Sequence, residues 1–166
     1  MFQNATGIVV FAFGSPSSIE PNQLLMHIST VSTILYGADQ VFTQKELPFG
    51  PERHNIEYIS EKENAEPTLR IARWAVKRAI AKKMRQLIII AATPHVGRCI
   101  RDVRWAIKEQ KAEIEAEICS DMRLYPINKW FCAESSQPRS RSSWAWWPRE
   151  LILRCMPMWL YTKVAG

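Results

Sequence analysis

The stretch that decides the fold is residues 84–107, MRQLIIIAATPHVGRCIRDVRWAI. An unbroken apolar run over residues 87–92 ends at Thr93-Pro94-His95, and a helical pattern with three arginines follows at once. Short apolar runs rich in isoleucine are typical of strands in a parallel sheet, and proline favours the first position of a helix. We therefore predict a strand over 86–92 that leads directly into a helix from 94 to about 110.

Strands and helices alternate on both sides of this stretch. The patterns predict strands over 7–13 (GIVVFAF), 40–46 and 56–59, an edge strand over 112–119, and helices over 21–37 and 67–83. Helix-length crossovers make neighbouring strands parallel, with helices on both faces of the sheet. The expected fold is α/β, a three-layer Rossmann-like sandwich with a mainly parallel sheet of about five strands.

Apolar residues recur at helical spacing in each expected helix, which is the pattern of a helix with one core-facing side. They are Leu24, Leu25, Ile28, Val31, Ile34 and Leu35 in the first helix, Leu69, Ala72, Val76, Ala79 and Ile80 in the second, and Val96, Cys99, Ile100, Val103 and Ile107 in the third.

The chain of 166 residues fits one domain over 1–166. Residues 121–143 lose periodicity and end in SSQPRSRSS, so we expect a long loop there. Residues 144–166, WAWWPRELILRCMPMWLYTKVAG, form a Trp-rich C-terminal helical extension. This extension either covers the sheet or lies on a membrane surface as an amphipathic helix.

Composition narrows the class of protein. The four cysteines are far apart and show no metal-ligand or disulfide spacing, acids and histidines are not clustered, and no built-in metal site is indicated. The sequence leaves any cofactor unknown. No stretch reaches the roughly 18 apolar residues of a membrane span, and the N-terminal apolar run lacks the flanks of a signal peptide. The expected location is cytoplasmic, with contact to the inner face of the membrane as an option.

The net charge of +6 is unevenly distributed. Residues 66–111 contain 12 Lys or Arg and 3 Asp or Glu, so this segment carries +9 and the remainder of the chain −3. Such a distribution indicates a basic face that attracts anions, or two solvated helix faces without a partner.

A candidate site lies where the carboxyl ends of the strands meet, because open parallel sheets bind ligands there. Three loops converge at this edge: residues 14–18, the loop after Gln44, and residues 93–98. Thr93 is the expected N-cap of the helix that follows, which places His95 in its first turn and Arg98 one turn further on. Free amides at a helix N-terminus favour an anion.

Individual side chains at this edge have more than one interpretation. His95 can act as a general acid or base, as a hydrogen-bonding ligand residue, or as a structural residue. The Gly-Ser-Pro-Ser-Ser turn at 14–18 can offer backbone amides to an anion, although it lacks the spacing of a dinucleotide or P-loop motif. Glu63 and Asn64 either approach the same crevice or cap the helix that follows them.

The run LIIIAATPHVGRCIRDVRWAI resembles the signature of the YdcF-like (SanA/ElyC) domain family, in which a hydrophobic strand ends in Thr-Ser-x-Tyr-His-x-x-Arg-Ala and leads into a helix. His95 and Arg98 match the family's histidine and arginine. Thr68, 27 residues before His95, matches a threonine at the start of the preceding helix. The strand and loop GIVVFAFG resembles the family's opening strand, which includes Gly14 here.

The resemblance covers residues 68–107, with substitutions inside the motif. Ala92, Pro94 and Pro67 stand where the family has serine, tyrosine and asparagine, and Arg70-Ile71 stands where it has Glu-Asn. A divergent member is therefore indicated. The resemblance implies a Rossmann-like domain, a nucleotide-type ligand and a bacterial source, and it leaves the reaction undefined.

Together these observations give His95 as the candidate catalytic residue and a set of candidate ligand-binding residues: Gly14, Ser15, Ser17, Gln44, Glu63, Asn64, Thr68, Thr93 and Arg98. The first functional hypothesis is a protein that binds a small anionic ligand, of nucleotide or phosphate type, with hydrolase or transferase activity as an extension. The alternative is a basic module that binds nucleic acid or an anionic membrane surface without catalysis.

Overall fold

The computed structural model describes residues 5–50, 55–59 and 67–165. Its centre is a sheet of five strands in the order β3-β2-β1-β4-β5, and all neighbouring strands are parallel. The strands are β1 (Thr6–Val10), β2 (Gln40–Thr43), β3 (Ile56–Tyr58), β4 (Gln86–Ile90) and β5 (Glu115–Ile118). The predicted α/β class and five-stranded parallel sheet are confirmed.

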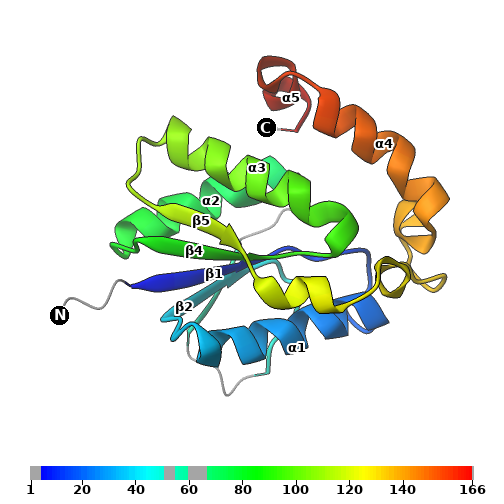
Figure 1. Ribbon diagram of the computed structural model, residues 1–166, viewed down its shortest axis with the longest axis horizontal. Helices are drawn as coiled ribbons and strands as arrows, with labels where there is room; N and C mark the ends of the chain where they lie inside the picture. The colour runs from blue at the N-terminus through cyan, green and yellow to red at the C-terminus, as the bar shows by residue number, and fades with distance from the viewer. Residues whose placement is uncertain (1–4, 51–54, 60–66, 166) are drawn as a thin grey trace.

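Helices cover both faces of this sheet and complete a three-layer sandwich. Helix α1 (Glu20–Leu35) lies on one face, and α2 (Thr68–Ala81) and α3 (Thr93–Glu109) lie side by side on the other (Figure 1). Two hydrophobic cores result, because successive strand side chains point to opposite faces. Val9 and Ile89 pack under α2 and α3, whereas Val10 and Ile90 pack under α1.

The three central strands end earlier than the sequence pattern predicts. Strand β1 ends at residue 10 instead of 13, β2 at 43 instead of 46, and β4 at 90 instead of 92. Residues 11, 13, 14 and 44 remain buried after the chain leaves β1 and β2, and residues 91 and 92 remain buried after β4, whereas Lys45 is exposed. Apolar patterning shows burial and cannot separate a buried strand from a buried loop.

The expected apolar stripe of α1 is only partly buried. Leu25 and Ile28 are in the core, but Ile34 is 79% and Leu35 66% exposed. The helix is rotated toward Asn22, whose side-chain oxygen accepts from the Phe13 amide at 2.9 Å and whose amide nitrogen donates to the carbonyl of Gly14.

The expected core stripe of α2 is wrong at one position. Ile80, which we expected in the core, is 41% exposed, because Ala75 and Ile71 occupy the buried side of that helix.

The segment between the sheet and the tail packs as part of the domain. It forms three short 3-10 helices, η1 (Ser120–Leu124), η2 (Ile127–Trp130) and η3 (Pro138–Arg141). Met122 and Trp130 are buried in the core on the α1 side. Residues 121–143, where we expected a long loop, therefore contribute side chains to the core on the α1 side of the sheet.

The C-terminal extension forms two helices, α4 (Ser143–Cys155) and α5 (Met158–Ala165), separated at Pro157. Figure 1 shows them folded back along the α3 side of the molecule. Within the described ranges, no helix has both the length and the apolar character needed to cross a membrane.

Candidate functional site

A cavity of about 720 Å³ lies at the carboxyl edge of the sheet. Its walls come from the loops after β1 and β2, the first turns of α2 and α3, η3, the inner side of α4 and the end of α5. Cavities of roughly 300–1,000 Å³ at this edge of a parallel sheet are typical ligand sites.

The structure brings together five of the residues predicted for the site: Gly14, Gln44, Thr68, His95 and Arg98 all line this cavity. Ser15, Ser17 and Thr93 do not line it. Glu63 and Asn64 lie outside the described residues.

The loop after β1 is tied to the segment before α4. The Ser15 amide donates to the hydroxyl of Ser135, and the Ser15 carbonyl accepts from the Ser136 amide at 2.7 Å. Gly14 has a φ of +86°, and a Cβ there would lie 2.7 Å from the hydroxyl oxygen of Ser140. The polar groups that we expected to face an anion thus hold the C-terminal third of the chain against the sheet.

Thr93 is not the N-cap of α3. The helix begins at Thr93 itself, the cap position is Ala92, and no side chain caps the first turn. The Thr93 hydroxyl instead donates to the Met122 carbonyl at 3.3 Å. Pro94 takes the second helical position and not the first, which shifts the start of α3 back by one residue.

Arg98 is buried, with 6% of its surface exposed, and its guanidinium is fully engaged inside the protein. Nε donates to Glu150 at 3.0 Å, one terminal nitrogen donates to the hydroxyl of Thr68 at 2.9 Å, and the other donates to Nδ1 of His95 at 3.2 Å. Glu150 comes from α4 and also accepts from Arg154 at 2.9 Å. An internal carboxylate therefore occupies the position where the sequence led us to expect a ligand anion.

The charges around Arg98 depend on one another. Burial opposes the charged form of Arg98, but its contacts, chiefly the Glu150 carboxylate, outweigh this and raise the pKa of Arg98. Tyr161 of α5 donates to Asp102 at 2.6 Å, and burial together with that carboxylate raises the pKa of Tyr161 to about 12. Burial also raises the pKa of Asp102. Two members of this network, Glu150 and Tyr161, come from the tail helices α4 and α5.

His95 is a neutral imidazole at physiological pH. Burial lowers its pKa well below 6.5, and the cations Arg98, Arg154 and Arg149 lower the pKa further. An arginine can only donate, so Nδ1 must accept from Arg98, and the neutral ring carries its proton on Nε2. His95 packs edge to face against Trp146, with ring centroids 5.3 Å apart. This arrangement suits a hydrogen-bond donor better than a general base.

Sequence reasoning missed the residues that the C-terminal third contributes. Glu150 and Tyr161 complete the buried network, and Trp146, Arg139 and Arg149 line the cavity. Of the missed residues, only Asp102 could have been found from the sequence, because it lies one helical turn beyond Arg98 on the same helix. The others required knowledge of how the tail folds back, which no local pattern carries.

Arg139 and Arg149 are the accessible cations of the cavity. Both are exposed, and within the described ranges neither makes a hydrogen bond or ion pair. Partial desolvation lowers the pKa of Arg149, and the nearby positive charges of Arg139 and Arg98 lower it further.

Glu46 also lines the cavity, and its Oε2 is buried with no hydrogen-bond partner among the described residues. Among those residues, no group of three or more His, Cys, Asp or Glu side chains could hold a metal ion.

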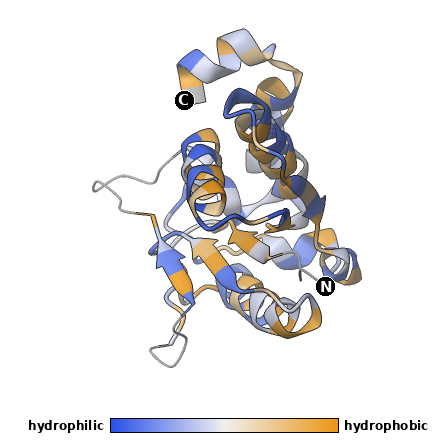
Figure 2. Ribbon diagram, turned by 90° about the vertical axis from the view of Figure 1, so that its left-hand side faces the viewer, coloured by the Kyte–Doolittle hydropathy of each residue, from blue (hydrophilic) through white to orange (hydrophobic). Residues whose placement is uncertain are grey.

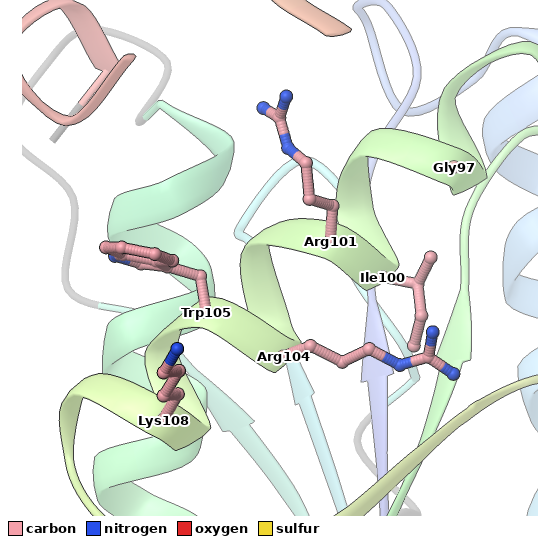
Figure 3. Close-up of a pocket in the computed structure, with 6 residues that line it drawn as sticks. All are labelled: Gly97, Ile100, Arg101, Arg104, Trp105 and Lys108. Carbon is pink, nitrogen blue, oxygen red and sulfur yellow. The ribbon is translucent and has the colours of Figure 1, made fainter. Parts of the chain in front are cut away.

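A second hollow of about 380 Å³ lies on the outer side of α3. Arg101, Arg104 and Lys108 line it together with Trp105 (Figure 3). Arg101 is occupied, because it donates to the Leu153 carbonyl at 2.8 Å and so holds the end of α4. Figure 3 shows the three basic side chains pointing in different directions, so they do not converge on one small anion.

The fold and this site define an α/β protein with a basic cavity at the carboxyl edge of a parallel sheet. Comparison of the chain with known protein families, with curated proteins and with solved structures finds no match.

Proposed function

We propose that this protein binds a small anionic ligand, of nucleotide or phosphate type, in the cavity at the carboxyl edge of the sheet. The observation that carries the proposal is the pair of exposed arginines, Arg139 and Arg149, which face a cavity of about 720 Å³ and have no described ion-pair partner. Two like charges held close together are stabilised when an anion binds between them.

The proposed roles of the predicted residues follow from their contacts. Arg98 is already paired with Glu150, so it orients His95 and does not clamp the ligand itself. His95 donates from Nε2 to the ligand. Glu46 accepts from a hydroxyl or amino group, which its unpartnered oxygen requires. We propose binding without base catalysis by His95, because Nδ1 of His95 already accepts from Arg98 and the other ring nitrogen carries the proton. The motif at residues 68–107 supports the further proposal of a divergent YdcF-like domain.

Thermal unfolding with a panel of phosphorylated metabolites tests this proposal. A ligand present at about 100 times its dissociation constant adds about 2.7 kcal/mol to stability. We expect the shift in melting temperature to disappear in the double variant Arg139→Gln/Arg149→Gln. The matched control is Arg123→Gln, which removes an exposed arginine outside the cavity and should keep the shift. A shift that survives in the double variant, or no shift with any compound, would refute the proposal.

A second candidate is nucleic-acid binding by the outer side of α3. The spread of Arg104 and Lys108 beside Trp105 favours it, because an extended polyanion can contact basic groups that do not converge. Binding to single-stranded DNA should then fall steeply with salt and weaken in Arg104→Gln/Lys108→Gln. Equal retention of this variant and the parent protein on the nucleic acid would exclude the outer side of α3.

A further inference from the structure

The outward side of α4 carries a continuous apolar stripe. Trp144, Pro148, Leu151, Ile152 and Cys155 are spaced so that they share one side of the helix, and all five are exposed. The exposed fractions are 89% for Trp144, 53% for Leu151 and 63% for Ile152. The opposite side is buried and includes Glu150 and Leu153. Helix α4 is thus amphipathic, with an apolar side toward solvent.

Helix α5 adds one more exposed apolar side chain outside the cavity, Trp159, at 66%. Figure 1 shows α4 and α5 at the outer edge of the molecule, with no other element drawn beyond them. A solvent-exposed apolar face of this kind marks an interaction surface in most proteins. We call the exposed residues Trp144, Pro148, Leu151, Ile152, Cys155 and Trp159 the tail face.

The charges around the tail face have one sign. Within residues 138–165 the exposed charged side chains are Arg139, Arg141, Arg149 and Lys163. The single acid of this segment, Glu150, is 2% exposed and paired with Arg98 and Arg154. Folding hides the one negative charge and leaves the positive charges at the surface.

We propose that the tail face binds the surface of an anionic lipid bilayer. In this arrangement α4 and α5 lie in the plane of the interface, with Trp144 and Trp159 at the level of the headgroups and the aliphatic side chains below them. Arg141 and Lys163, the exposed cations of this segment that do not line the cavity, contact lipid phosphates. Each cation near such a surface is attracted to it.

Charge favours a lipid surface over a second copy of the chain. A twofold dimer through the tail face would bring the same cationic rim together from both subunits. The described tail presents no exposed acid to offset this repulsion. An anionic bilayer supplies both the apolar region and the opposite charge.

Vesicle cosedimentation of the full chain tests the proposal. We expect binding to phosphatidylcholine vesicles that contain phosphatidylglycerol, weaker binding to phosphatidylcholine alone, and a further decrease as salt is added. The variant Leu151→Ser/Ile152→Ser should bind about a hundredfold more weakly, because each of the two aliphatic side chains withdrawn from water contributes roughly a factor of ten.

The matched control is Ile34→Ser/Leu35→Ser. These α1 residues are similarly exposed, at 79% and 66%, and α1 lies at the opposite end of the molecule from α4 and α5 (Figure 1 and Figure 2). The control should bind vesicles like the parent protein. No binding to anionic vesicles, or equal losses in both double variants, would overturn the proposal. So would a dimer in solution that Leu151→Ser/Ile152→Ser converts to a monomer while vesicle binding stays unchanged.

Discussion

At the scale of single residues, the ion pair between Arg98 and Glu150 decides what the site can do. Both side chains are almost fully buried, and the pair links α3 to a helix about 50 residues further along the chain. A buried charge without its partner is strongly destabilising. The pair therefore fixes the tail and at the same time removes Arg98 from the ligand.

Replacement of Glu150 by glutamine should lower the free energy of unfolding by about 3 kcal/mol or more, because it leaves the buried guanidinium of Arg98 without its counter-charge. Denaturant unfolding followed by circular dichroism measures the change. The control is Glu20→Gln, which removes an exposed ion pair with Lys129 and should cost about 0–1 kcal/mol. Equal costs for both variants would show that Arg98 does not depend on Glu150.

His95 should make the protein less stable in mild acid. Its pKa in the folded protein lies below 6.5, so the unfolded chain binds the proton more readily. The contribution of His95 is therefore fully present above pH 6.5 and is lost as the pH falls toward the folded pKa. The free energy of unfolding of the parent protein should fall more steeply between neutral and acidic pH than that of His95→Gln. Denaturant unfolding at a series of pH values measures both. Burial raises the pKa of Asp102, so Asp102 contributes the opposite pH dependence of stability. Because Asp102 is present in both proteins, its contribution drops out of the difference between them.

The contacts that Arg98 makes with Thr68 and His95 could be predicted from the sequence. Thr68, His95 and Arg98 were grouped by the motif resemblance and by one-turn spacing, and the structure places them in direct contact. The counter-ion could not be predicted. Glu150 lies in a segment where local patterns indicate a helix but give no information on the surface against which it docks.

At the scale of elements, the loop after β1 determines where the C-terminal third can pack. Gly14 is enclosed by the hydroxyls of Ser135 and Ser140 and has a positive φ. The strand, the loop and the helix were predicted from apolar runs and turn residues. Their boundaries at the carboxyl edge were wrong, because the first residues after β1 and β4 are as buried as the strands before them.

Gly14→Ala should destabilise the protein more than Gly37→Ala. Both glycines have positive φ, at +86° and +57°, so each alanine carries the backbone cost of about 1 kcal/mol. At Gly14 the new Cβ would also lie 2.7–2.8 Å from two serine hydroxyls, whereas at Gly37 nothing lies within 4 Å. Overpacking adds about 1–3 kcal/mol. Thermal unfolding of the two variants compares them directly, and equal losses would contradict this account of the loop.

At the scale of the whole molecule, the chain has a rigid sandwich and a separately attached tail. The sheet and the first three helices enclose two large hydrophobic cores. The tail joins them through a small cluster of buried Leu69, Leu153 and Tyr161, through Trp146, which packs against the core on the α1 side, and through the polar network around Arg98. Few buried apolar contacts are the usual mark of a unit that opens locally.

Hydrogen exchange should therefore show two levels of protection. Amides of β1 and β4, which lie in the centre of the sheet, should exchange only through global unfolding, and amides of α4 should exchange through a smaller opening that releases the tail. Glu150→Gln should speed exchange in α4 and in β4 by about the same factor, because the ion pair is lost in both openings, so α4 should still exchange faster than β4 in this variant. Mass spectrometry of peptic peptides measures the exchange rates of α4 and of β1 and β4 in one experiment. Identical protection of α4 and β4 in the parent protein would mean that tail and sandwich unfold as one unit, and the tail could then not move independently of the cavity that it closes.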